Sequence, residues 1–238
     1  SHPNLLDWLA RRFIEDDWSI KALHRRILLS STWQQTSLAS QDALRLDPEN
    51  RLFSRTPIRR LEAEAARDAL LFVSGELDET MQGTLLTLKN RAYFFDHTSI
   101  DKTTYDSSRR SIYLPVVRNN VYDIFQLLDF PDPAVSTGNR SETVVASQAL
   151  LMLNSELVMK SGRTLAGRLL AEAGHDEERL QRLYLLAFGR PATKAEKNAD
   201  FRLLRRLMSA SDSEASRQDA WAVLCHVALA ANEFLYLR

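Results

Sequence analysis

The residues best suited by type to do chemistry lie in one polar stretch, residues 109–153. Its carboxylates Asp129 and Asp132 are a candidate acid and base pair, because two carboxylates flanking a cleft can hydrolyse a glycosidic bond. Its arginines and asparagines can bind a sugar or a carboxylated ligand. The candidate ligand-binding residues are Arg110, Arg118, Asn119, Asn120, Asp129, Asp132, Asn139 and Arg140.

A structural role for the same charges is the alternative interpretation. Buried charges need partners, so Arg110 and Arg118 can instead neutralise Asp129, Asp132 or Glu62 and tie the irregular stretch to neighbouring helices. The two aspartates are too close along the chain for the sequence to predict the distance between their carboxyl groups. Both interpretations therefore remain open at this point.

Metal and haem sites have little support in the sequence. The chain has one cysteine, in Leu224-Cys225-His226, whereas covalent haem needs C-x-x-C-H and cysteine-rich zinc or iron–sulfur sites need several thiols. We therefore expect no cofactor in this chain. The best local metal-binding set is an acidic loop that is also explained by simple solvation, so we predict no metal site; its members are Asp96, His97, Asp101 and Asp106.

The motifs of common enzyme classes are missing as well. The chain has no G-x-S-x-G elbow, no phosphate-binding loop and no G-x-G-x-x-G. Cys225 lies among apolar residues of a predicted helix and is expected to be inert, and His226 is expected to be a core histidine bonded to a carbonyl. The sequence thus favours a binding module over an enzyme.

Composition excludes further classes. The 238 residues are 45% hydrophobic and 26% charged, which is typical of a globular protein. The formal net charge is zero, so a dedicated nucleic-acid binder is disfavoured. No apolar run approaches the roughly 20 residues that a membrane-spanning helix needs.

Apolar spacing and capping residues predict mostly helix. A first helix follows Pro3, and Ser19 caps a second. A third is predicted to open at Thr56-Pro57 and to stop at Gly75. If this third helix is buried on several sides, its charged residues must pair with distant partners, because isolated buried charges are too costly; these residues are Arg59, Arg60, Glu62 and Arg67.

The last hundred residues also read as helices. Val144–Leu153 is almost entirely apolar, which predicts a helix buried all round. Asp176 is expected to cap a helix that stops at Gly189, and Thr193 with Glu196 forms a capping box for the next. The final helix is expected to be lined by apolar side chains, those of Trp221, Leu224, Cys225, Ala228 and Leu229.

Two segments are less regular. Residues 76–108 are predicted to be a long loop with some strand at 92–95, and Ile112–Val117 is rich in β-branched residues, with Pro115 favouring an edge position. No internal repeat or linker is present. The sequence therefore predicts a mainly α, single multi-helix domain over residues 1–238, with a small irregular or β element near Ile112–Val117.

Five successive blocks of the chain carry a resemblance to one family. They are TPIRRLEAEAARDALLFVSGELD, RRSIYLPVVRNN, LLDFPDPAVSTGNRSETVVASQALLMLNS, LYLLAFGRPATKAE and WAVLCHVALAANEFLYL. These blocks resemble the planctomycete-specific domain of unknown function at the C-terminal end of large proteins that often carry cytochrome c-like domains. The opening residues from His2 also resemble the middle of that family's domain.

The resemblance implies a context rather than a chemistry. It implies that the chain is the C-terminal part of a longer domain, in the periplasm or cell envelope. Its partners would be neighbouring domains of the parent protein or a cytochrome c-like domain. It supplies no catalytic residues, and residues 81–104 contribute little to it.

Two functions follow from these observations. The first is a binding or scaffolding module of a cell-envelope protein, with residues 109–140 as its functional surface. The second is a glycan-acting enzyme that hydrolyses an anionic polysaccharide. In that case Asp129 or Asp132 would act as acid or base, and Arg118 or Arg140 would bind the anionic group.

Overall fold

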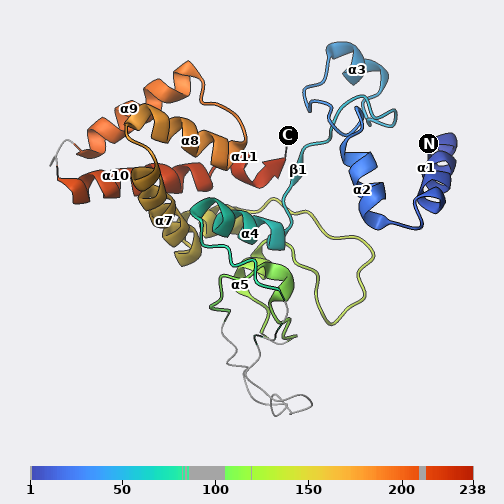
Figure 1. The fold of residues 1–238 in the computed structure, drawn as a ribbon, viewed down its shortest axis with the longest axis horizontal. Helices are drawn as coiled ribbons and strands as arrows, with labels where there is room; N and C mark the ends of the chain where they lie inside the picture. Colours follow the sequence, from blue (N-terminus) through green and yellow to red (C-terminus); the bar gives the residue numbers. More distant parts are fainter. Residues whose placement is uncertain are drawn as a thin grey trace, which may run out of the picture. The chain divides into compact units, whose positions relative to one another are not determined.

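Helices dominate the computed structural model, and this confirms the predicted mainly α class (Figure 1). The structure describes residues 2–81, 83, 85, 105–118, 120–208 and 213–237. Two strands of two residues each, β1 (Arg59–Arg60) and β2 (Tyr236–Leu237), pair in a small sheet. The chain divides into two compact units, residues 1–59 with 236–238 and residues 60–235. The extent of a single domain over residues 1–238 stays a prediction.

The first unit contains three helices, α1 (Pro3–Glu15), α2 (Ile20–Leu28) and α3 (Gln41–Leu46). The hydroxyl of Ser19 accepts a hydrogen bond from the N–H of Ala22, which confirms the predicted N-cap of α2. An ion pair of 2.7 Å joins Arg26 of α2 to Asp16, the residue that ends α1. The turn between these helices is therefore fixed by a cap and by a pair of charges.

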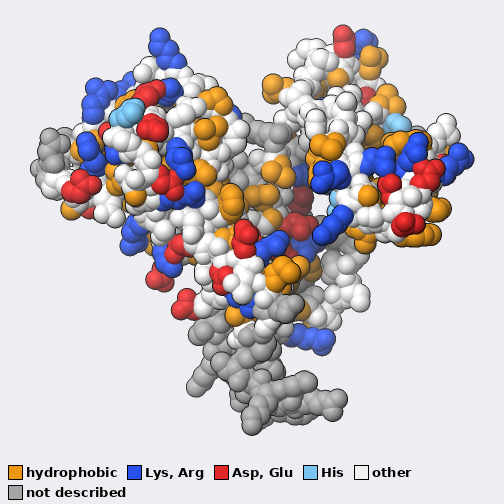
Figure 2. Space-filling model, in the orientation of Figure 1, with side chains coloured by type: hydrophobic (Ala, Val, Ile, Leu, Met, Phe, Trp, Pro, Cys, Tyr) orange, Lys and Arg blue, Asp and Glu red, His pale blue; other side chains and the backbone are white. Residues whose placement is uncertain are grey.

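Apolar side chains of the first unit remain exposed. Leu6, Trp18 and Leu38 are 69%, 66% and 82% exposed, and no apolar side chain among the described residues 2–59 is buried. Figure 2 shows hydrophobic side chains at the surface of this unit. The one buried residue in that range is Asp47, whose carboxylate accepts hydrogen bonds from the N–H groups of the turn that follows α3. Polar contacts in turns thus contribute more to this unit than an apolar core.

The second unit contains the remaining helices. They are α4 (Ala63–Ser74), the 3₁₀ helix η1 (Ser111–Tyr113), α5 (Asp123–Leu127), α6 (Ala146–Asn154), α7 (Glu156–Glu172), α8 (Asp176–Phe188), α9 (Lys194–Met208), α10 (Glu214–Leu229) and α11 (Asn232–Leu235).

The core of the second unit is built where α7 crosses α10. Gly162 of α7 makes the close approach possible, because a Cβ at this position would lie 3.2 Å from backbone atoms of His226 in α10. The apolar side chains predicted to line the last helix are all buried. Nε2 of His226 lies 3.0 Å from the carbonyl oxygen of Met152, as expected, although His226 is half-buried rather than a core residue.

Helix α4 begins later than predicted. Thr56 does not cap it; its hydroxyl instead donates to the carbonyl of Gln35 at 2.8 Å. The next residues are extended and include β1, so pairing with distant backbone overrides the local helical preference there. Glu62 occupies the N-cap position, and Gly75 ends the helix with a φ of 82°, as predicted.

Two further segments can be compared with the expectation. Ile112–Val117 is irregular, one of the two forms predicted for it, with the 3₁₀ turn η1 followed by extended residues without a strand partner among those described. Helix α6 is not buried all round: Gln148 and Met152 are buried, but Leu150 and Leu153 are 57% and 54% exposed. An apolar sequence therefore did not guarantee a buried position. The strand predicted at 92–95 lies outside the described residues.

Candidate binding site

The carboxylate of Asp129 accepts the hydrogen bonds of a polar cluster. This cluster fixes the loop before α6. Its Oδ2 lies 2.6 Å from Nη2 of Arg60, and the two side chains are only 14% and 6% exposed. The N–H of Thr143 donates to the same oxygen at 2.8 Å, and its hydroxyl donates to Oδ1 at 2.8 Å. Gln148 of α6 donates at 3.4 Å. Asp129 has a φ of 61°, an unusual backbone conformation that these contacts maintain.

These contacts keep the Asp129 carboxyl ionised. Burial alone would raise the pKa of Asp129, but hydrogen bonds from Thr143 and from Arg60 outweigh it, and the pKa is lowered from its ordinary value. A general acid that protonates a glycosidic oxygen needs a raised pKa instead. The lowered pKa therefore does not fit a general-acid role for Asp129.

A second contact holds the same loop to α4. Arg140 donates two hydrogen bonds to the carboxylate of Glu64, with Nη–Oε distances of 2.7 and 2.9 Å. Its guanidinium also lies 5.7 Å from the ring centre of Phe130. Burial raises the pKa of Glu64, but the bonds from Arg140 lower it by more. Arg140 is thus paired within the fold.

Arg67 holds the segment before η1. It is 1% exposed, on the buried side of α4, and donates to the carbonyls of Ser107 and Arg109 and, at 3.2 Å, to the hydroxyl of Ser111. The neighbouring Asp68 accepts from the N–H and the hydroxyl of Ser111 at 2.8 and 2.6 Å. Because the partners lie some forty residues away, the predicted need for distant partners is confirmed for Arg67, as it is for Arg60. We call Arg60, Arg67, Asp129 and Arg140, with these partners, the α4 clamp.

The other predicted site residues are dispersed. Arg118, Asp132 and Asn139 are exposed, and Asp132 accepts from the N–H of Ala134 in a local turn. The carbonyl of Asn120 accepts from the hydroxyl of Tyr105 at 2.5 Å. Asn119 lies outside the described residues. Among the predicted residues, Arg110 lines a hollow beside α4.

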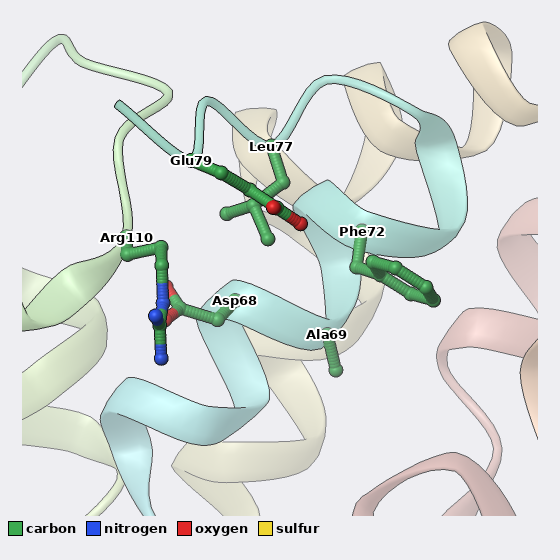
Figure 3. Close-up of a pocket in the computed structure, with 6 residues that line it drawn as sticks. All are labelled: Asp68, Ala69, Phe72, Leu77, Glu79 and Arg110. Atoms are coloured by element: carbon green, nitrogen blue, oxygen red, sulfur yellow. The ribbon is translucent and has the colours of Figure 1, made fainter. Parts of the chain in front are cut away.

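Arg110 lies at one side of a hollow of about 390 Å³ against α4 (Figure 3). Asp68 and Ala69 of α4 lie along its base, and Phe72, one turn after Asp68, lies on the side away from Arg110. Leu77 and Glu79, from the segment after α4, close the third side. The hollow thus combines an apolar surface with groups of both charges.

Two backbone contacts place these residues together. After Gly75 the chain folds back, with the N–H of Leu77 donating to the carbonyl of Leu71 at 3.0 Å. The next residue, Asp78, forms a parallel bridge with Arg109, so the segments that carry Glu79 and Arg110 run side by side. The clamp residue Arg67, which binds the carbonyl of Arg109, therefore also positions the hollow.

A second hollow of about 510 Å³ lies on the other side of Phe72. It shares Phe72, Leu77 and Glu79 with the first and is completed by residues at the end of α4 and on α7. Here the guanidinium of Arg168 is already occupied, because it donates to Glu172 at 2.9 Å and to the carbonyl of Val73 at 3.0 Å. We call the two hollows together the Phe72 groove; its lining residues are Asp68, Ala69, Phe72, Ser74, Gly75, Leu77, Glu79, Arg110, Arg168 and Glu172.

Two charged side chains of the groove have no partner among the described residues. Neither the carboxylate of Glu79 nor the guanidinium of Arg110 makes an ion pair or a hydrogen bond there. Beside Glu79, on the side away from Arg110, the ring of Phe72 is 58% exposed (Figure 3). Unpaired groups beside an exposed aromatic ring are available to a ligand in a way that the clamp residues are not.

Phe72 and Glu79 were not identified as site residues from the sequence. A signal was present for Phe72, since the buried stripe of α4 runs through Ala66, Leu70 and Val73 at helical spacing, and Phe72 falls outside it. A large aromatic residue outside the buried stripe of a helix is a candidate for binding. Glu79 had no comparable signal, because its position depends on the turn at Gly75.

Residues 1–204 match the family described as Protein of unknown function (DUF1553). The chain belongs to this family. The family match confirms the resemblance at the level of a domain of unknown function. No curated protein and no solved structure matches this DUF1553 chain.

The described residues of this DUF1553 domain show no centre for metal or thiol chemistry. No three of its described histidine, cysteine, aspartate and glutamate residues are grouped so that they could hold a metal ion. Cys225 is fully buried, and burial raises the pKa of its thiol well above the ordinary value. None of the helices in the described ranges combines the length and the apolar character that a membrane span needs. Within the described part of the domain, the Phe72 groove is therefore the strongest candidate site.

Proposed function

We propose that this DUF1553 chain is a non-catalytic binding module, and that the Phe72 groove is its binding surface. Glu79 and Arg110, which have no partner among the described residues, and the exposed ring of Phe72 beside Glu79 carry the proposal. The carboxylates and arginines of the α4 clamp do not compete for this role, because the carboxylate oxygens and the Nη groups of the arginines are bonded within the fold.

The setting of the module is part of the proposal. We infer that it works in the periplasm or cell envelope, as one part of a larger planctomycete-type protein that also carries cytochrome c-like domains. The resemblance of its sequence blocks supports this setting. The module would bind no haem of its own, since covalent haem needs C-x-x-C-H and the chain offers only Cys225-His226. It would act as a scaffold between a ligand and its neighbouring domains.

Thermal unfolding of the whole chain with a set of probes tests this function. The probes are neutral hexasaccharides, an anionic hexagalacturonate and a soluble cytochrome c. A ligand that binds the folded state alone raises its stability by RT ln(1 + [L]/Kd), about 2.7 kcal/mol at a hundredfold excess over Kd. We expect at least one probe to raise Tm in the unmodified chain and in Leu185→Ala, and to lose its effect in Phe72→Ala. Leu185 is a matched control because it is similarly exposed, on α8.

Two results would contradict the proposal. One is release of reducing sugar from a polysaccharide that is abolished by Asp129→Asn in a protein that still folds, because that result would make the chain an enzyme. The other is that no probe produces a shift that depends on Phe72. Circular dichroism of each variant, which checks that the helices are retained, makes either result interpretable.

A further inference from the structure

The shape of the Phe72 groove says more about its ligand. The two hollows, of about 390 and 510 Å³, lie on either side of a ridge made by Phe72, Leu77 and Glu79. Each falls within the roughly 300–1,000 Å³ of a small-molecule site, and both open on the same aromatic ring. A ligand that fills both must continue across the ridge, as a chain of linked rings does.

The charges of the groove limit what can bind. Three carboxylates line it, those of Asp68, Glu79 and Glu172, against two guanidinium groups, those of Arg110 and Arg168. Asp68 and Glu172 already face further arginines, Arg67 at 3.5 Å and Arg182 at 2.6 Å. The charges without a partner among the described residues are therefore one carboxylate, on Glu79, and one guanidinium, on Arg110. An anionic ligand would meet Glu79, and juxtaposed like charges are costly. A strongly cationic ligand would meet Arg110, which has no ion-pair partner among the described residues. The balance therefore favours a ligand without net charge.

The two unpaired groups define the polar chemistry of such a ligand. Glu79 can only accept hydrogen bonds, and Arg110 can only donate them. A hydroxyl group does both, so a polyhydroxylated molecule satisfies either side of the groove. Beside Glu79, on the side away from Arg110, the exposed ring of Phe72 offers an apolar face on which the C–H groups of a sugar ring can pack.

A peptide fits these features less well. Peptides that add to a sheet need a free strand edge, and amphipathic helices need a long hydrophobic groove with several anchor pockets. The lining of the Phe72 groove supplies no strand, and its apolar side chains are limited to Ala69, Phe72 and Leu77. A protein partner is therefore the less favoured occupant.

We propose that the Phe72 groove binds an uncharged saccharide chain, with one sugar ring on each side of Phe72. Glu79 accepts from hydroxyl groups of the chain and Arg110 donates to its oxygens. This inference rests on the proposed binding function and replaces the anionic glycan expected from the arginine-rich sequence with a neutral one.

Isothermal titration with defined hexasaccharides tests the inference. The neutral probes are β-1,4-linked hexamers of glucose, mannose and xylose; the charged probes are hexagalacturonate and the hexamer of glucosamine. We expect a neutral hexamer to bind most tightly, with an affinity that changes less than twofold between 50 and 500 mM NaCl, because screening acts on charged pairs. Phe72→Ala should weaken binding at least tenfold, and Glu79→Gln and Arg110→Gln severalfold each.

The Leu185→Ala variant controls for general effects on α-helical structure and should bind as the unmodified chain does. The inference is overturned if a charged hexamer binds more tightly than every neutral one, or if no neutral hexamer binds. Binding of cytochrome c that depends on Phe72, without binding of any neutral hexamer, would overturn this inference while leaving the proposed function intact. If no probe shows binding that depends on the Phe72 groove, both this inference and the proposed function are contradicted.

Discussion

Arg60 and Arg110 both lie close to α4, but they differ in burial and in hydrogen bonding. The guanidinium of Arg60 is 6% exposed and donates to the carboxylate of Asp129 and to two backbone carbonyls. The guanidinium of Arg110 is exposed and has no partner among the described residues. The same contrast separates Asp129, which accepts from several donors, from Glu79, which accepts from none of those described.

This difference shows how two polar regions of one fold can be told apart. In the α4 clamp, the charges hold a segment that has few regular hydrogen bonds of its own, so their partners are fixed by the fold. In the Phe72 groove, the carboxylate of Glu79 and the guanidinium of Arg110 have no partner among the described residues and remain available. The clamp should therefore determine stability, and the groove should determine binding. Four substitutions test this difference, and they follow in order of the loss of stability that each should cause.

The largest loss is expected for Arg67→Met. The substitution keeps the length of the side chain but leaves the carbonyls of Ser107 and Arg109 and the hydroxyl of Ser111 without their donor in a buried site. Unmet buried acceptors cost about 1–3 kcal/mol each, partly offset by relaxation, so we expect a loss of about 3 kcal/mol in the free energy of unfolding. Urea unfolding followed by circular dichroism measures it.

Arg118→Met is the control for Arg67→Met. Arg118 is exposed, and the same change of residue type there should alter the free energy of unfolding by less than about 0.5 kcal/mol. Equal effects of the two substitutions would show that the clamp is not a stabilising element.

Asp129→Asn should cause the next largest loss. The amide keeps the shape of the side chain but removes the charge that faces Arg60 and one of the oxygens that accept from Thr143. Hydrogen bonds to charged groups contribute about 1.5–3 kcal/mol, so a loss of about 2 kcal/mol is expected. Asp132→Asn, three residues away and exposed, should change stability little, and a comparable loss at Asp132 would contradict the contrast between the two aspartates.

The effect of Asp129→Asn should also depend on pH. The pKa of Asp129 is lower in the folded state than in the unfolded chain, so the folded state gains stability from its ionised form. That gain is complete above the unfolded value of about 3.9 and disappears as the pH falls through the lower folded value. The difference in stability between the unmodified chain and Asp129→Asn should therefore be constant from pH 7 to 5 and shrink below pH 4. A constant difference down to pH 2 would contradict the lowered pKa.

These residues also show what the sequence could reveal. Local rules succeeded where a few neighbouring residues decide the structure: Ser19 caps α2, Gly75 and Gly189 end helices with positive φ, and the capping box of Thr193 and Glu196 forms. They failed at Thr56, whose hydroxyl bonds to a residue more than twenty positions away. Capping by Asp176 was also wrong by one position, because His175 is the N-cap.

The candidate site depended on such long-range pairing even more. The sequence placed arginines and carboxylates in the right stretch, but it could not distinguish a paired charge from a free one. That distinction depends on Arg60, Glu64 and Arg67 reaching across forty to seventy-six residues. The sequence could not predict the exposed side of α6 either, because an apolar helix has the same sequence pattern whether or not another element packs against it. The pairing of charged side chains and the burial of apolar helix faces are both determined by the tertiary structure.

A smaller loss of stability is expected for Glu64→Gln. Its bidentate pair with Arg140 is partly exposed, with 25% of the Glu64 side chain accessible, so screening by solvent limits the loss to about 1 kcal/mol. Glu62→Gln is the matched control, because Glu62 faces the same guanidinium at 3.4 Å but is 64% exposed, and should cost only a few tenths of a kcal/mol. A larger loss at Glu62 than at Glu64 would contradict the assignment of Glu64 as the clamp partner.

The smallest effect is expected for Glu79→Gln combined with Arg110→Gln. Each single substitution, and the double one, should change the free energy of unfolding by less than about 0.5 kcal/mol, because neither side chain has a partner to lose among the described residues. The double-mutant cycle should give a coupling energy of zero within an error of about 0.3 kcal/mol, whereas the same cycle on Arg60 and Asp129 should exceed 1 kcal/mol. A coupling above 1 kcal/mol between Glu79 and Arg110 would mean that the two close on each other across the hollow in solution. A saccharide would then have to break that pair before it could bind, and the groove would lose its main distinction from the clamp.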